Sequence, residues 1–190
     1  MRKSRFYAAL LACLLLAVIG CGCGRKQTES TVVTAPDEQI LRDLFDQNLE
    51  CAEIFERSFL PMEENPVEGT FYKITDDRFH TFGDLEKFTK SVFIQSEADR
   101  LLGPRYEDRA LYRDVSGVLC IDASLMGGRG YYVDWTDYRL EILSTDKNEV
   151  TFKVIATVEW PAEVPVAEPY EVKTRAVMEN GEWRLTELIV

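Results

Sequence analysis

A glycine-rich stretch at residues 125–132, LMGGRGYY, comes closest in this sequence to a motif with known chemistry. Glycine-rich loops can hold phosphate with their backbone N–H groups at the start of a helix. A phosphate loop ends in Gly-Lys-Ser/Thr, whereas this stretch leads into a strand-like run. The sequence therefore favours a connection between strands, which could also serve as a recognition loop made of Gly127, Gly128, Arg129, Gly130, Tyr131 and Tyr132.

Other residue types offer little catalytic chemistry. His80 is the only histidine, and neither a Gly-x-Ser-x-Gly motif nor a papain-like cysteine context accompanies it. The acid pairs at residues 63–64 and 76–77 lack the alternate spacing and central glycine of a calcium loop. We therefore expect a protein that is not an enzyme, with no catalytic residue, no metal site and no cofactor. A base at Asp122 or Asp134 is the remaining catalytic alternative.

The amino terminus has the pattern of a secretory signal. Basic residues precede an apolar run that ends in Val18-Ile19-Gly20-Cys21, which resembles a bacterial lipobox. A transmembrane helix is the alternative, but the run is shorter than the roughly 20 residues that a span needs. The sequence predicts a signal peptide over residues 1–20, a lipid on Cys21 and a polar tether over residues 21–35. The domain at residues 36–190 would then be anchored to a cell membrane, facing outside the cytoplasm.

The net charge limits the classes of binding partner, and the number of cysteines bears on disulfide bonding. The formal net charge of −11 disfavours binding to nucleic acid or anionic lipid and favours a basic protein partner. We expect a monomer. Once the signal peptide and the lipidated cysteine are set aside, Cys23, Cys51 and Cys120 remain, an odd number that is not a disulfide framework. A bridge between Cys51 and Cys120 stays open.

Helices are predicted in the first half of the domain. Apolar residues recur at helical spacing over residues 38–59, and Asn48 on that stripe would need a hydrogen-bond partner if buried. Thr81 and Ser96 each stand three residues before an aspartate, which is a capping-box spacing. They should begin a second helix and a short third one that ends at Gly103.

Strands are predicted in the second half. Residues 61–69 are expected to form a loop, and residues 71–74 a short extended segment. Later segments alternate apolar and polar residues: 110–113 with 118–122, 131–143, 150–160, and 170–178 with 183–190 around Asn180-Gly181. Helices before antiparallel strands predict an α+β fold, a single domain in which the N-terminal helices pack on a curved antiparallel β-sheet.

Two segments together resemble a known family, the IseA-type inhibitors of D,L-endopeptidases. One runs from Tyr72 through YKITDDRF to Phe82-Gly83-Asp84-Leu85 and an amphipathic helix. The other runs from Ala110-Leu111-Tyr112 to Val118-Leu119-Cys120-Ile121-Asp122 and leads into the glycine-rich loop. The likeness covers roughly residues 38 to 190.

The resemblance implies a surface lipoprotein that binds NlpC-type cell-wall hydrolases and blocks their catalytic cleft, which regulates autolysis. The loop at residues 127–132 would enter that cleft, because bare backbone approaches closely and tyrosines supply contact area. The alternative is a lipoprotein domain with a cone-shaped sheet, similar to the nuclear transport factor and ketosteroid isomerase folds. Such a domain would bind a small ligand or have no catalytic role, and an apolar cavity between the first helix and the sheet, with Asn48 or Asp134 directed into it, would favour it.

Overall fold

The computed structural model describes residues 36–127, 133–160 and 166–190. These residues all belong to one compact unit that spans Val33–Val190. They form an α+β fold of helices and antiparallel sheets, in agreement with the prediction from the sequence.

Helix α2, Glu38–Ala52, carries the predicted apolar stripe. Asp37 begins the helix, and its side chain accepts a hydrogen bond from the backbone N–H of Ile40 at 2.9 Å. The helix continues into a π-helical turn, η1, Glu53–Arg57. Six residues of the α2 stripe are buried: Leu41, Leu44, Phe45, Asn48, Cys51 and Ala52.

Helices α3, Phe82–Val92, and α4, Gln95–Leu102, follow as a pair. Thr81 caps α3 in a full capping box, as its spacing predicts. The cap predicted at Ser96 is wrong, because α4 begins at Gln95 and its N-cap, Ile94, has no capping side chain. Gly103 ends α4, where a Cβ atom would lie 2.7 Å from the backbone oxygen of Asp99.

The first sheet, here sheet A, has the strand order β1-β2-β6-β5. Its strands are β1 Met62–Glu68, β2 Phe71–Ile74, β5 Tyr112–Val115 and β6 Val118–Asp122. Strand β1 corrects the loop predicted at residues 61–69. Because β1 is an edge strand with every residue exposed, its sequence shows no alternation of buried residues. A two-stranded ribbon of β3, Pro104–Tyr106, and β4, Arg109–Ala110, precedes β5.

The second sheet, sheet B, has the order β10-β9-β8-β7. Its strands are β7 Val133–Asp146, β8 Glu149–Trp160, β9 Val166–Glu179 and β10 Glu182–Leu185. In β8 the predicted alternation is confirmed, since Val150, Phe152, Val154, Ala156 and Val158 are all buried. Asn180 and Gly181, with φ of 54° and 87°, form the predicted tight turn between β9 and β10. Strand β10 ends at Leu185, short of the predicted residue 190.

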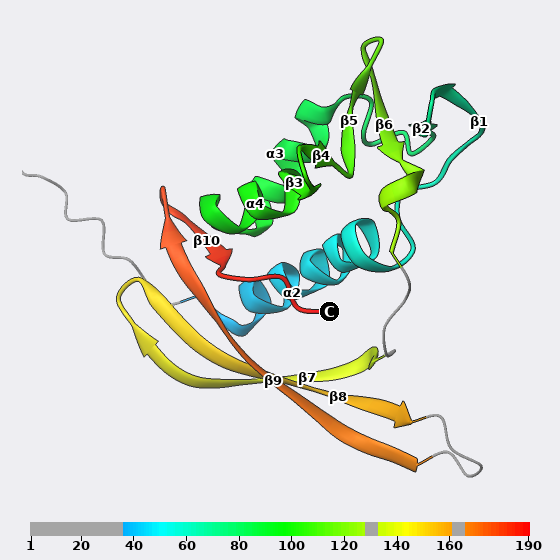
Figure 1. Ribbon diagram of the computed structural model, residues 1–190. Coiled ribbons are helices and arrows are strands. Elements are labelled where there is room, and N and C mark those ends of the chain that lie inside the picture. The colour runs from blue at the N-terminus through cyan, green and yellow to red at the C-terminus, as the bar shows by residue number, and fades with distance from the viewer. Residues whose placement is uncertain (1–35, 128–132, 161–165) are drawn as a thin grey trace, which may run out of the picture. The chain divides into compact units, whose positions relative to one another are not determined.

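The core lies where the helices meet the sheets. Helix α2 contacts α3 and also β7 and β10 of sheet B, and Figure 1 shows β7, β8 and β9 as long, bent strands. The ring of Phe45 meets those of Trp135 and Tyr138 edge to face, with centroids 5.2 and 4.7 Å apart. This aromatic contact fixes α2 on sheet B.

Candidate functional site

The predicted recognition loop falls largely on residues that the structure does not describe. Gly127 is described and exposed, and a Cβ atom built there would meet no atom within 4 Å. Gly128, Arg129, Gly130, Tyr131 and Tyr132 lie outside the described residues, as does the predicted lipidation site Cys21. The described elements nearest to this predicted site are those at the two ends of the loop.

The loop connects two different sheets. Strand β6 pairs with β2 and β5, whereas β7 pairs with β8, so the predicted connection between strands joins two sheets and does not close a hairpin. At its first end, the 3-10 turn η2, Ala123–Leu125, is held by a hydrogen bond from the Ala123 N–H to the Thr70 oxygen at 2.9 Å. At its second end, Val133 pairs with Val158. Both ends of the loop therefore start from paired backbone.

Asp122 anchors the first end of the loop. It is fully buried, and its Oδ1 accepts hydrogen bonds from the N–H and the hydroxyl of Ser124 at 3.1 and 2.6 Å. Its Oδ2 has no hydrogen bond but lies 3.5 Å from Nη1 of Arg109. Burial disfavours the charged carboxylate, yet hydrogen bonding by Ser124 and by the Thr70 side chain, together with the charge of Arg109, outweighs it and lowers the pKa of Asp122.

The acids considered as bases lack the usual environment of a general base. A carboxylate that takes protons near neutral pH needs a raised pKa. The pKa of Asp134 is instead lowered by hydrogen bonds from Thr136, whose N–H donates at 2.9 Å, and Asp134 is exposed. With the pKa of Asp122 also lowered, the catalytic alternative gains no support at either residue.

The segment around His80 ties α3 to sheet A through backbone contacts. The His80 oxygen accepts from the Leu119 N–H at 2.9 Å, and the His80 N–H donates to Oδ2 of Asp84 at 3.0 Å. The Phe82 N–H donates to Oδ1 of Asp114 at 2.7 Å. His80 thus helps to join these elements through its main chain.

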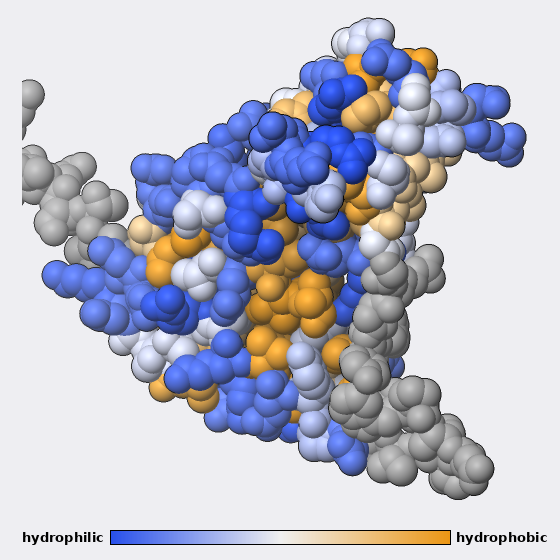
Figure 2. Space-filling model, in the orientation of Figure 1, coloured by the Kyte–Doolittle hydropathy of each residue, from blue (hydrophilic) through white to orange (hydrophobic). Residues whose placement is uncertain are grey.

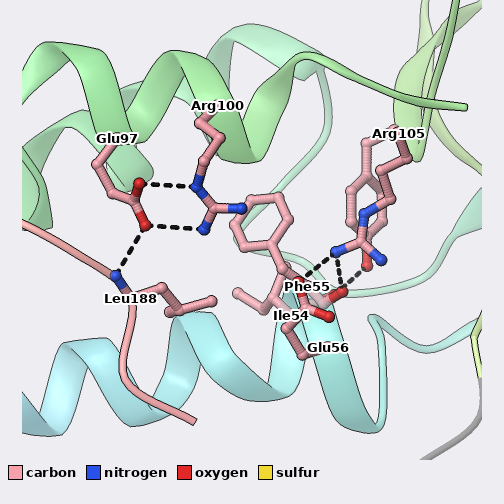
Figure 3. Close-up of polar contacts among 8 residues, drawn as sticks. Ile54, Phe55, Glu56, Glu97, Arg100, Arg105 and Leu188 are labelled. Carbon is pink, nitrogen blue, oxygen red and sulfur yellow. Dashed lines mark hydrogen bonds and ion pairs between the residues drawn. The ribbon is translucent and has the colours of Figure 1, made fainter. Parts of the chain in front are cut away.

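A polar junction that sequence reasoning missed surrounds the π-helical turn (Figure 3). The Tyr112 hydroxyl donates to the Ile54 oxygen at 2.7 Å and accepts from the Leu60 N–H at 3.1 Å. Arg105 donates to the Phe55 oxygen and pairs with Glu56 at 2.8 Å. A π-turn shifts the helical hydrogen bonds by one residue, so carbonyls there become available to side chains. No local pattern in the sequence indicates such a turn.

A second group of polar contacts holds the C-terminal segment against α4. The carboxylate of Glu97 accepts two hydrogen bonds from Arg100, both at 2.8 Å, and one from the Leu188 N–H at 2.8 Å (Figure 3). These contacts satisfy a carboxylate that is almost buried, at 9% exposure.

Asn48 has the partner that its buried position requires. Its amide donates to the Ile189 oxygen at 2.9 Å and accepts from the Ile189 N–H at 2.8 Å. Both of its polar groups are therefore engaged by the C-terminal segment. Since Asp134 is exposed, neither residue offers the inward polar group that a ligand-binding domain of the alternative kind would use.

An open depression of about 270 Å³ lies on sheet B. It is lined by Asp137, Arg139, Ile155, Ala156, Thr157, Glu168 and Pro169. The depression follows the irregular pairing of β7 between Asp134 and Arg139, where β7 has more residues than β8 opposite it. Its lining is mostly polar, unlike the apolar cavity of the ligand-binding alternative.

The two described thiols do not pair. Cys51 and Cys120 are both free and buried, so the bridge left open by the sequence is absent. Burial raises the pKa of both thiols. They are therefore poor nucleophiles in the folded protein.

The surface of the described part is largely hydrophilic. Figure 2 shows apolar side chains gathered near the centre of the face in view, in the region where Figure 1 marks the C-terminus, Val190, which is 47% exposed.

None of the described helices has the length and apolar character that crossing a bilayer requires. Within residues 36–127, 133–160 and 166–190, no group of three or more histidine, cysteine or acidic residues has a metal-binding arrangement.

Comparison of the chain with protein-family models and with curated proteins finds no match.

Proposed function

We propose that the chain is a membrane-anchored lipoprotein that faces outside the cytoplasm and inhibits NlpC-type cell-wall D,L-endopeptidases by binding them. The lipid on Cys21 holds it at the membrane, and the loop at residues 127–132 enters the hydrolase cleft. The inhibitor itself performs no chemistry in this proposal.

The proximity of the two segments that resemble the inhibitor family is the observation that carries this proposal. Tyr72 of the first segment pairs with Ile121 of the second across β2 and β6. The Leu119 N–H donates to the His80 oxygen at 2.9 Å. Segments that lie about 40 residues apart thus form one continuous structure, as a shared family pattern would require.

The position of the loop further supports the proposal. An inhibitory loop must keep its shape when it meets a cleft, because ordering a loose segment on binding costs affinity. Here the preceding turn is held by Asp122 and Thr70, and the following strand is paired at Val133. Arg and Tyr, both present in this loop, are among the residues that contribute most to protein interfaces.

The test is inhibition of a purified NlpC-type D,L-endopeptidase that cleaves a peptidoglycan peptide, with the full lipidated chain in detergent as the titrant. We expect a stoichiometric loss of turnover that weakens as salt rises, because the acidic chain attracts a basic hydrolase. Substituting Arg129→Ala together with Tyr131→Ala should weaken inhibition by at least about tenfold, the equivalent of roughly 1.4 kcal/mol.

The matched control is Lys147→Ala together with Asn148→Ala, which removes one cation and one polar side chain from the exposed turn between β7 and β8. Inhibition by this control should equal that of the unaltered chain. If the loop variant and the control inhibit equally well, the loop is not the contact. If no NlpC-type hydrolase is inhibited, the proposed function is wrong.

A further inference from the structure

Sheet A and the β3–β4 ribbon, which Arg109 links through its contact with Asp122, carry a surface on which two arginines stack against two aromatic rings. The guanidinium of Arg113 lies over the ring of Phe71, 3.7 Å from its centroid, and that of Arg109 lies over Tyr106 at 5.8 Å. We call Phe71, Tyr106, Arg109 and Arg113 the arginine–aromatic surface.

The strand register places Phe71 and Arg113 on one face of sheet A. Phe71 pairs with Asp122 and Arg113 pairs with Cys120, and residues 120 and 122 of β6 point to the same side. Arg109 reaches Asp122 on that same side, at 3.5 Å. The opposite face, with Ile121 and Tyr112, belongs to the hydrophobic core, whereas Arg113 and Tyr106 are exposed, so the arginine–aromatic surface faces away from the core.

On this surface the guanidinium of Arg113 leaves hydrogen-bonding capacity unused. Within the described part of the chain, Arg113 forms no ion pair, although the sequence has 33 acidic residues. A guanidinium stacked on a ring keeps its N–H edge free for bidentate contact with a carboxylate. Tyr106 is 59% exposed, the most exposed large hydrophobic residue among those described. Arginine beside one exposed and one half-buried aromatic ring is the composition of a protein-interface hot spot.

We propose that the arginine–aromatic surface docks a segment of a partner protein that carries a carboxylate beside an apolar side chain. The carboxylate binds the free edge of Arg113, and the apolar side chain packs on Tyr106 and Phe71. A long polyanion fits less well, because a formal net charge of −11 repels it and few cations are gathered here. The inference does not rest on hydrolase inhibition, since it concerns other residues than the loop at 127–132.

The test measures binding of the full chain to defined peptides by fluorescence polarisation. The probe is a labelled ten-residue peptide series with Glu two positions from Leu, beside the same series with Gln in place of Glu. We expect the Glu peptides to bind and the Gln peptides to bind at least about tenfold more weakly. Arg113→Glu should abolish binding of the Glu peptides, and a probe with Lys at the same position should restore it.

Arg139→Glu is the matched control, because Arg139 is an exposed arginine on β7 of sheet B and receives the same charge change. It should leave binding unchanged. Arg113→Lys keeps the charge and the fold but loses the planar contact, so it should bind the Glu peptides more weakly than the unaltered chain does. Each variant is first checked for an unchanged thermal unfolding midpoint.

Four results would overturn the inference. They are equal binding of the Glu and Gln peptides, equal loss in the Arg113 and Arg139 variants, tighter binding of polyphosphate than of any peptide, and no carboxylate-dependent binding at any concentration at which the probe stays monomeric. Hydrolase inhibition that persists in Arg113→Glu would leave the proposed function standing while this inference is judged by the peptides alone.

Discussion

At the scale of single residues, Asp122 combines complete burial with a charge. Its neighbours explain why it can remain ionised, because Ser124 donates two hydrogen bonds and Arg109 supplies the opposite charge. The sequence presents this aspartate as the polar end of an apolar strand and as an alternative base, but it does not show that the carboxylate is buried. Its burial depends on the backbone of residues 70–71, which sheet A brings to it, and on Arg109 of the β3–β4 ribbon.

The lowered pKa of Asp122 predicts a specific loss of stability in acid. Its folded pKa lies below the ordinary value of 3.8, so the ionised group contributes to stability fully above that value. The contribution disappears as the pH falls through the lower, folded value. The free energy of unfolding of the unaltered chain should therefore exceed that of Asp122→Asn near neutral pH, and the difference should shrink from about pH 4 downwards.

Urea unfolding of both proteins between about pH 6 and about pH 2.5 measures this difference. Asp77→Asn is the control, since Asp77 is exposed in the same half of the fold. A gap between the unaltered chain and Asp122→Asn that stays constant over the whole range would show that the carboxylate is not preferentially stabilised when ionised.

Asn48 shows what the sequence does make predictable at this scale. A polar residue on an apolar helical stripe must find a partner, and that requirement follows from spacing alone. The identity of the partner does not follow. It is the backbone of Ile189, 141 positions away, and nothing local in either segment indicates the other.

At the scale of elements, the π-helical turn after α2 depends on side chains from elsewhere in the fold. Tyr112 and Arg105 bind the two successive carbonyls of Ile54 and Phe55. Tyr112→Phe removes the hydroxyl and leaves the buried Leu60 N–H and Ile54 oxygen without this partner. We expect the free energy of unfolding to fall by about 1–3 kcal/mol.

Equilibrium unfolding in urea checks this expectation, with Tyr106→Phe as the matched control. The Tyr106 side chain is 59% exposed, so the same substitution there should change stability by less than about 0.5 kcal/mol. Equal, small effects at both positions would mean that water replaces the Tyr112 hydroxyl without cost.

A helix or strand can be predicted from the sequence where the burial of one face gives its apolar residues a regular spacing. Strand β8 alternates because one face is buried, and α3 begins at Thr81 because a capping box is a local structure. Strand β1 has no buried face, and Ser96 has the spacing of a cap without acting as one. Strand β1 pairs with the strand that follows it directly, but its exposed residues leave no alternation to read. The start of α4 depends on a distant contact, from the Ile94 N–H to the Leu185 oxygen at 3.0 Å, so the local pattern at Ser96 is misleading.

At the scale of the whole molecule, the α+β class follows from the order of helices and strands, but the division into two sheets does not. The chain leaves sheet A after β6 and enters sheet B at β7, and the glycine-rich loop makes that passage. A loop between two sheets and a hairpin loop can share the same residues. The sequence therefore identifies the candidate loop but not the elements that carry it.

The proposed membrane anchor gives a prediction for the entire chain. Cys21→Ala should abolish incorporation of a labelled fatty acid and leave the signal segment uncleaved, because the acylated cysteine becomes the new N-terminus. Cys23→Ala should be labelled and processed like the unaltered chain. Metabolic labelling in a bacterial host, with the mass of the purified protein, measures both outcomes, and label that persists in Cys21→Ala would place the anchor elsewhere.

The hydrogen bonds between Asn48 and Ile189 also bear on how fast the chain folds. They join residues 141 positions apart, and the contacts of Glu97 with Leu188 span 91. Contacts so distant along the chain form late, because the entropy of closing a long loop is lost before the contact stabilises anything. A polypeptide that must cross a membrane unfolded, as the proposed lipoprotein would, benefits from this delay, since the buried Asn48 of its first helix has no partner until the last residues arrive.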